Sequence, residues 1–426
     1  MARTNSRDQE LRARAEAVIP GGMYGHQSTA LLPDDYPQFF ERGEGAYIWD
    51  VDGRRYLDMM CAYGPNLFGY ANPSIDAAFV RQLGLGDTLT GPTALMVELA
   101  ETMVGMVSHA DWAMFCKNGT DATTMALTAA RAHTRRKTVI RAKGAYHCAA
   151  PWCVPRPTGT LESDRAYQIV CDYNDVASLE AAVAQAGDDL ACIFAAPFKH
   201  DAFVDQAQPD PAYARRAREL CDETGALLII DDVRAGFRIA RDCSWSKLGV
   251  QPDLSTWGKC LANGHGLSAL LGNDKCRKAA GSIFVTGSFW FQAAPMAAAL
   301  ETMHLVKTTD YLERMMALGE RLRSGLDERA RAAGFSLRQT GPATMPLFLF
   351  DDDPDLRKGF CFSSEMLARG IYVHPWHNMF LCAAMTHADI EDALNAAEGA
   401  FGALKRQSAT LQPVPKLAFL ATGGTR

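Results

Sequence analysis

The strongest constraint on the fold is a long alternation of helical segments with short apolar stretches of strand length, from about residue 72 to residue 271. Helical patterns lie at 73–84, 93–108, 120–133, 176–185 and 211–224. Strand-like stretches lie at 112–116, 137–141, 166–170, 190–195, 226–230 and 266–271. Such alternation is typical of a mostly parallel sheet covered by helices. The region therefore predicts an α/β fold.

The flanking segments show a different pattern. Helices are expected at 6–18, in a long stretch after residue 300, and at 388–405, and strands at 46–50, 55–59, 346–350 and 371–374. The first helix stops at Pro20-Gly21-Gly22, and a turn centred on Gly53 joins the first two strands. We expect a large domain of residues 60–310 and a smaller α+β domain built from residues 1–59 and 311–426.

Charge and hydropathy exclude several classes of function. The formal net charge is -6, which does not indicate a protein that binds nucleic acid. No apolar run reaches the length of a membrane span, and the polar first 20 residues predict no secretory signal. The 12 cysteines form no CxxC pair, so we expect buried thiols in a reducing compartment, a cytoplasmic location and no metal site.

A carboxylate follows the apolar stretch at 227–230. Asp231 and Asp232 end it abruptly, and ligands of open α/β sheets bind at the carboxyl ends of strands. A buried carboxylate needs a cation, and a protonated pyridine nitrogen is one. A helix cap or a surface turn is the alternative for Asp231.

A lysine in an unusual setting follows another short strand. Lys259 comes directly after Gly258 and the strand-like residues 254–257. Burial there would lower its pKa and free the amine for imine formation. The alternative is a lysine whose amine reaches solvent.

Two further strand ends carry candidate cofactor contacts. Asn118, Gly119 and Thr120 lie where a helix begins, and backbone N–H groups at a helix start bind phosphate. Tyr146 follows the strand at 137–141 and could stack on a planar ring. Ordinary capping and core packing are the alternatives.

Together, these four elements resemble the class III (ω-type) aminotransferases and glutamate-1-semialdehyde aminomutase, enzymes of pyridoxal-5′-phosphate (PLP) fold type I. The resemblance runs from the glycine pair at 21–22 to the helix ending near 405. It implies that Lys259 carries PLP as a Schiff base and then moves a proton. It also implies that Asp231 pairs with the pyridine nitrogen, while Val233 and Tyr146 cover opposite faces of the ring.

The same resemblance implies that Asn118, Gly119 and Thr120 hold the phosphate. It further implies a homodimer in which Gly287 and Ser288 of the neighbouring subunit contact that phosphate.

The chain departs from the family pattern at two places. The usual Asp-Glu-Val is Asp231-Asp232-Val233, and the usual Glu-Pro is Ala196-Pro197. Asp201 falls where the aminomutase has an asparagine near the cofactor's phenolic oxygen.

The expected substrate pocket lacks arginine. Relatives that act on amino acids offer an arginine near residues 23–32 or 372–381, and neither stretch contains one. Aromatic residues stand there and nearby instead, and an apolar pocket suits an amine without an adjacent carboxylate. The candidate pocket residues, each with core packing as its alternative, are Tyr24, Tyr63, Trp152, Trp290, Phe291 and Trp376.

One subgroup of the family is the best match. Residues 23–26, 61–70, 110–119, 231–238, 286–291 and 377–384 resemble the aminotransferases that deaminate hydrolysed fumonisin, a long-chain aminopolyol. The resemblance implies an amine donor of this kind and pyruvate as acceptor, with ketone and alanine as products. The acceptor's carboxylate could be held by Arg234, Arg238, Lys199 or His26.

Three other functions remain open at this point. One is an aminomutase or racemase on the same scaffold, which the missing arginines disfavour. Another is a β-amino-acid aminotransferase, which meets the same objection. A third is a non-catalytic PLP-binding protein, which the presence of Lys259 and Asp231 disfavours.

Overall fold

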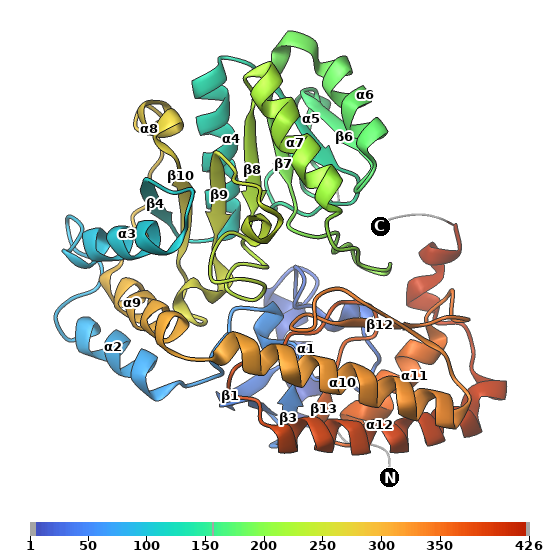
Figure 1. Ribbon diagram of the computed structural model, residues 1–426. Helices are drawn as coiled ribbons and strands as arrows, with labels where there is room; N and C mark the ends of the chain where they lie inside the picture. Colours follow the sequence, from blue (N-terminus) through green and yellow to red (C-terminus); the bar gives the residue numbers. More distant parts are fainter. Residues whose placement is uncertain (1–5, 156, 423–426) are drawn as a thin grey trace.

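The computed structural model describes residues 6–155 and 157–422, which form two groups of elements (Figure 1). The upper group in the view contains a seven-stranded sheet in the order β4-β10-β9-β8-β7-β5-β6. Its strands are β4 Trp112–Cys116, β5 Thr138–Ala142, β6 Gln168–Cys171, β7 Leu190–Ala195, β8 Leu227–Asp231, β9 Leu254–Trp257 and β10 Ser268–Gly272. Only β10 runs antiparallel to its two neighbours, so the sheet is mostly parallel. The predicted fold class is confirmed.

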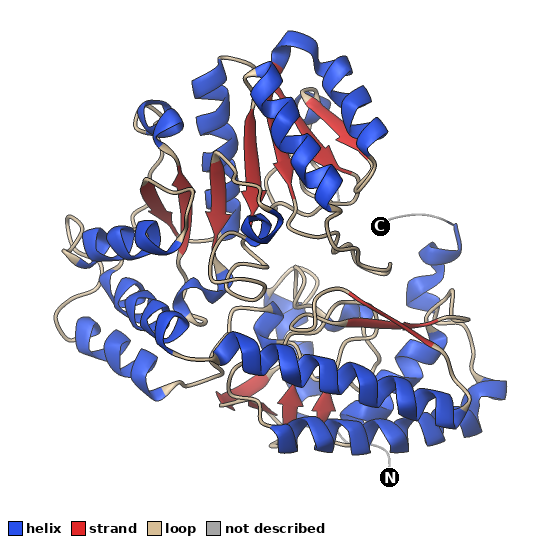
Figure 2. Ribbon diagram, viewed as in Figure 1, coloured by secondary structure: helices blue, strands red, loops and turns tan. Residues whose placement is uncertain are grey.

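Helices cover both faces of this sheet (Figure 2). They are α2 Pro73–Leu83, α3 Leu95–Met106, α4 Gly119–Thr134, α5 Glu162–Arg165, α6 Val176–Ala186, α7 Pro211–Thr224, α8 Asp274–Ala280 and α9 Ala293–Thr308. Strand β8 shows why both faces are needed. Leu227 and Ile229 belong to the apolar cluster that contains α4, while Leu228 and Ile230 belong to the cluster that contains α6 and α7. Side chains of a strand alternate between faces, so β8 is apolar throughout.

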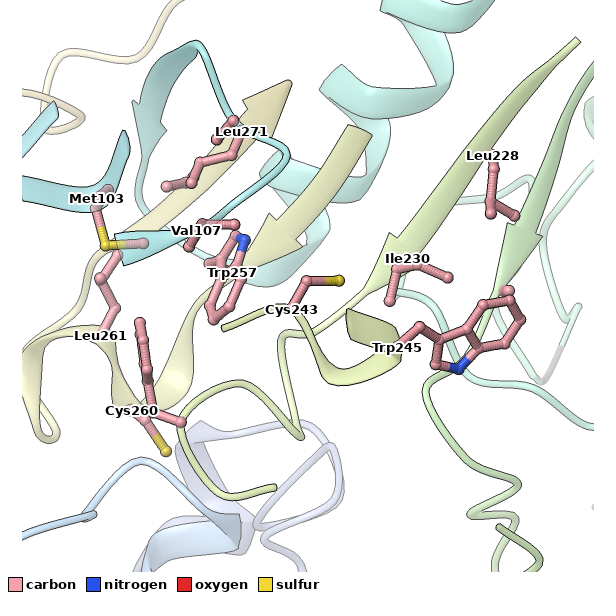
Figure 3. Packing of buried hydrophobic residues seen from close by; sticks show 14 of the residues in the cluster. Met103, Val107, Leu228, Ile230, Cys243, Trp245, Trp257, Cys260, Leu261 and Leu271 are labelled. Carbon is pink, nitrogen blue, oxygen red and sulfur yellow. The ribbon is translucent and has the colours of Figure 1, made fainter. Parts of the chain in front are cut away.

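The core on the α3, α6 and α7 face contains two fully buried tryptophans. Figure 3 shows Trp257 close to Val107 and Met103, and Trp245 beside Leu228 and Ile230. Both rings therefore cover the face of the sheet next to the strand ends that carry the candidate site.

The lower group contains a four-stranded sheet in the order β1-β2-β3-β13, with β13 parallel to β3, and a β11–β12 hairpin. The strands are β1 Phe40–Glu44, β2 Tyr47–Asp50, β3 Arg55–Asp58, β11 Leu337–Thr340, β12 Leu347–Phe350 and β13 Ile371–Tyr372. The helices are α1 Ser6–Val18, α10 Tyr311–Ala333, α11 Arg357–Ala368 and α12 His387–Gln407. The N- and C-terminal segments thus share one core, and Tyr36 donates a hydrogen bond to the carbonyl of Val373 at 2.7 Å.

We propose that these groups are two domains, divided at residues 60–310 as the sequence predicts. The helical stretch expected after residue 300 is two helices, because α9 ends at Thr308 and α10 begins at Tyr311. In residues 6–155 and 157–422, no helix combines the length and apolar character needed to cross a bilayer.

Candidate functional site

The parallel strands bring the predicted residues to one edge of the large sheet. β8 ends at Asp231, β9 leads into Lys259, and β4 leads into Asn118. Tyr146 follows β5 after a short turn. These carboxyl ends point toward the lower group of elements (Figure 1). A ligand there would lie between the two groups, as expected for an open α/β sheet.

Asp231 is the anchored carboxylate of this edge. It is 6% exposed, and its Oδ1 accepts hydrogen bonds from Thr256 Oγ1 at 2.9 Å and from the backbone N–H of Val233 at 3.2 Å. His147 Nδ1 lies 2.9 Å from the other oxygen. The carboxylate is therefore held in place, but sequence reasoning named neither Thr256 nor His147. Two signals could have found them: His147 directly follows Tyr146 in the sequence, and Thr256 lies opposite Asp231 in the β8–β9 register.

Lys259 begins a short 3₁₀ turn in a strained backbone conformation. Its φ is +43°, in the left-handed region that L-residues rarely adopt. Gly258 before it allows close approach, since a Cβ there would lie 2.6 Å from Ser268 Oγ. Burial, and then the charge of Arg234, lowers the pKa of Lys259 to about 8. The backbone thus holds a partly neutral amine at the edge.

Helix α4 presents its N-terminus to the same edge. Asn118 caps the helix, because its side chain accepts from the N–H of Asp121 and the Asp121 carboxylate accepts from the N–H of Asn118. Gly119 and Thr120 open the first turn, whose N–H groups have no acceptor within the helix. A Cβ on Gly119 would lie 2.8 Å from Val233 Cγ1, so only glycine permits this packing. The turn is a ready anion site.

Tyr146 and Asp201 stand on the loops beside these strand ends. Tyr146 is 42% exposed, and burial raises its pKa. Asp201 is half-buried against Gly144, where a Cβ would lie 2.3 Å from Asp201 Oδ2. Burial raises the pKa of Asp201, while Lys199 and then Arg234 act in the opposite direction. The roles expected for Tyr146 and Asp201 stay predictions.

The candidate pocket aromatics lie in three different settings. Tyr63 packs edge-on against His26, with ring centroids 4.8 Å apart, and Trp376 stacks on Phe203 at 4.2 Å. Trp152 and Trp290 belong to the apolar cluster on the α4 face of the sheet. Tyr24 is 74% exposed. The structure thus places Tyr63 and Trp376 on the side of the lower group, close to His374. The pocket roles of these five residues, and of Phe291, stay predictions.

Gly287 and Ser288 lie in an exposed apolar segment. Phe284 is 92% exposed, Phe289 60% and Phe291 37%. Gly287 packs closely on Trp290, whose Nε1 would be 2.3 Å from a Cβ at that position. Three exposed phenylalanines in one segment are unusual for a surface in contact with water, and they mark a surface suited to contact with protein.

Two arginines that the sequence could not distinguish lie in different environments. Arg238 is fully buried and donates to the carbonyls of Gly64, Asn66 and Leu381. Arg234 is half-buried, and one of its nitrogens, Nη1, donates to Asn378 Oδ1 at 2.9 Å. Arg238 therefore joins segments of the fold, whereas Arg234 lies in the site.

The arrangement unites an amine of lowered pKa, an anchored carboxylate and a helix N-terminus open to an anion. Such a set suits a ligand with an electrophilic carbon, a cationic ring nitrogen and a phosphate.

The chain is similar to characterised aminotransferases over almost its whole length. Residues 32–396 match the family described as Aminotransferase class-III. The chain is 57% identical to the aminopentol aminotransferase of Sphingopyxis macrogoltabida over 98% of this chain and 99% of that protein. The PLP internal aldimine form of the FumI protein of Sphingopyxis sp. MTA144 superposes with a TM-score of 0.96, at 57% identity, over 96% of this chain and 99% of that one. The β-phenylalanine aminotransferase of Variovorax paradoxus has a TM-score of 0.83, at 26% identity and 96% coverage of each chain. The chain therefore belongs to the class-III aminotransferases.

Proposed function

We propose that this class-III aminotransferase is PLP-dependent and moves an amino group from a long-chain aminopolyol, such as hydrolysed fumonisin, to pyruvate. The products are the corresponding ketone and alanine. The observation that carries the proposal is the joint placement of Lys259 and Asp231 at the sheet edge below the N-terminus of α4.

The residues present fit PLP by their chemistry. Asp231 is a buried carboxylate suited to a pyridinium nitrogen, and the N–H groups of Gly119 and Thr120 suit a phosphate. Val233 and Tyr146 would cover the faces of the ring, and Lys259 is the amine that would hold its aldehyde carbon. When bound, PLP supplies an electron sink that stabilises negative charge on the substrate carbon.

Lys259 is poised to move a proton. With a pKa of about 8, about one amine in ten is neutral at pH 7, against about one in 3,000 for an ordinary lysine. Its Nζ would take the proton from the carbon that bears the substrate's amino group. Asp231, held by Thr256 and His147, would keep its negative charge oriented throughout.

The substrate assignment rests on the pocket and on the relatives. The relative with 57% identity carries the name aminopentol aminotransferase. Residues 23–32 and 372–381 contain no arginine; the second stretch supplies His374 and Trp376 instead, and Tyr63 packs against His374. Such a surface accepts an alkyl amine without a neighbouring carboxylate, which disfavours a β-amino-acid donor or a mutase substrate.

We also propose a homodimer with the site at the interface. Phe284, Phe289 and Phe291 would be covered by the second subunit, and Gly287 and Ser288 of that subunit would reach the phosphate.

The cytoplasmic location remains a prediction from the cysteine pattern.

The test is an amine-donor panel with pyruvate as acceptor. It contains hydrolysed fumonisin, short aryl amines and β-amino acids, with Lys259→Ala as control. We expect ketone and alanine in equal amounts from the aminopolyol, and no turnover by Lys259→Ala. A mutase would release no free ketone and need no keto acid, and a strong preference for β-amino acids would contradict the substrate assignment.

A further inference from the structure

Arg234 is a cation at the site without an anionic partner in contact. It is half-buried, and its Nη1 reaches Asn378 Oδ1 at 2.9 Å and the carbonyl of His200 at 3.4 Å. Within the described ranges 6–155 and 157–422, no carboxylate oxygen lies within 4.0 Å of its nitrogens, and no acceptor is bonded to Nε or Nη2. Burial lowers the pKa of Arg234 to about 10, so the group stays protonated at neutral pH.

The nearby carboxylates are already engaged with other groups. Asp231 accepts from Thr256 and Val233 and lies beside His147. Asp201 packs on Gly144, and Lys199 acts on its charge more strongly than Arg234 does. Neither forms an ion pair with Arg234. A guanidinium with two free nitrogens is therefore positioned for an anion from outside the chain.

Asn378 orients the guanidinium group of Arg234. It is 2% exposed, and its Nδ2 donates to the carbonyl of Met379 at 2.8 Å, which turns Oδ1 toward Arg234. Because one nitrogen is held this way, the guanidinium plane is ordered before any ligand arrives.

The other candidates for the acceptor's carboxylate are less suitable. Arg238 is fully buried and bonded to three carbonyls. Burial lowers the pKa of His26 to about 4, so its ring is neutral at physiological pH. Lys199 faces the charge of Asp201.

We propose that Arg234 binds the carboxylate of the amino acceptor through its two free guanidinium nitrogens, and that it limits the acceptor to small 2-oxo acids with a single carboxylate. This inference rests on the proposed transaminase function and explains how a pocket without arginine at 23–32 and 372–381 still accepts a keto acid. The cation comes instead from the turn after β8, three residues beyond Asp231.

The limit to acceptors with one carboxylate follows from the other groups around the guanidinium of Arg234. The carbonyl of His200 lies 3.4 Å from Arg234 Nη1, and His377 adjoins Asn378, whose carbonyl oxygen lies 2.7 Å from His377 Nδ1. Burial lowers the pKa of both histidines well below the usual value. These rings are neutral at physiological pH and offer no second cation. A second carboxylate would be buried among neutral rings, so 2-oxoglutarate should be a poor acceptor.

The experiment compares pyruvate with its neutral methyl ester. The enzyme is loaded with the cofactor in its amine form and mixed with either acceptor, and kcat/KM is measured for wild type and Arg234→Gln. We expect the ratio of kcat/KM on pyruvate to kcat/KM on methyl pyruvate to fall about 100-fold in the variant. The half-reaction with amine donor is measured in parallel, because the charge of Arg234 also lowers the pKa of Lys259, and its loss should change the donor half-reaction and the methyl pyruvate reaction to the same small extent.

A binding measurement that does not depend on turnover accompanies it. Oxamate has the shape and charge of pyruvate but does not react, and its Kd is measured by calorimetry. Wild type should bind oxamate, and Arg234→Gln should bind it about 100-fold more weakly. Arg241→Gln is the matched control, because Arg241 pairs with Glu313 outside the site.

A second variant keeps Arg234 but gives it an anionic partner from within the chain. Asn378→Asp would place a carboxylate against Arg234 and should also weaken oxamate and pyruvate while sparing methyl pyruvate. Equal losses on both acceptors, or unchanged oxamate binding, would overturn the role of Arg234. If wild type binds oxamate through Arg234 but shows no amine:pyruvate turnover, the proposed function fails and the carboxylate site stands.

Discussion

Arg238 is predicted to be a structural residue, and its replacement tests the distinction between the two arginines. Its guanidinium is fully buried and donates to Gly64 O at 2.8 and 3.2 Å, to Asn66 O at 3.3 Å and to Leu381 O. In Arg238→Met, three carbonyl groups lose these donors.

The expected cost follows from the burial of those groups. An unpaired buried polar group costs about 1 to 3 kcal/mol. The Gly64 carbonyl keeps the Cys260 thiol as a donor at 3.3 Å, so the two carbonyls of Asn66 and Leu381 are left unpaired and cost about 2 to 6 kcal/mol. The methionine avoids the desolvation of a guanidinium, which returns several kcal/mol. The desolvation term offsets part of the cost of the unpaired carbonyls, so we expect the free energy of unfolding to fall by about 1 to 4 kcal/mol.

Urea unfolding followed by tryptophan fluorescence measures this change, since Trp245 and Trp257 are buried near the sheet edge. Arg321→Met, which removes a half-exposed ion pair with Glu391, should lower the free energy of unfolding by less than about 1 kcal/mol. The KM for pyruvate of folded Arg238→Met should equal that of wild type. A loss of less than about 1 kcal/mol together with a raised KM for pyruvate would refute the structural assignment.

Four further predictions follow from the structure. Gly119→Ala should weaken PLP binding by at least about tenfold, since its Cβ would lie 2.8 Å from Val233 Cγ1, whereas Gly105→Ala, with no atom within 4 Å, should leave binding unchanged in a spectroscopic titration. In the cofactor-free protein, Lys259 has a pKa of about 8, so its rate of amine modification should rise with pH and level off above about 8; a midpoint near 10.5 would contradict the burial argument. The same lysine should make the cofactor-free protein gain stability as pH rises from about 8 to about 10.5, because the unfolded chain binds more protons there, and Lys259→Met should remove this gain in urea titrations. Phe284→Asp should convert the proposed dimer to monomer and weaken PLP binding, as measured by light scattering and absorbance; a stable, fully loaded dimer would contradict the proposed interface.

The large sheet was predictable because its signals are local. Apolar runs alternate with helical patterns, and β4, β7 and β8 lie within one residue of their expected positions. The exposed edge strand β1 was missed, since Phe40–Glu44 contains three charged residues and little apolar pattern. The helix α11 was missed too, and it begins after a polar turn with Leu356 in a left-handed conformation.

The candidate site was predictable only where residues follow strands. Asp231 and Lys259 belong to that class, and parallel strands carry them to one edge. The hydrogen bond from Arg234 to Asn378 joins residues 144 positions apart in the sequence, so no local sequence pattern reveals it. The sequence likewise could not separate Arg234 from Arg238, because both lie in one turn and differ only in which partners the fold supplies.

The central claim is that Lys259 is the lysine that holds PLP. The direct test is to reduce the loaded enzyme with borohydride, digest it and locate the phosphopyridoxyl group by mass spectrometry. We predict a single modified lysine at position 259, and no labelled peptide from Lys259→Ala. A label on Lys199, Lys117 or any other lysine in place of Lys259 would contradict the account.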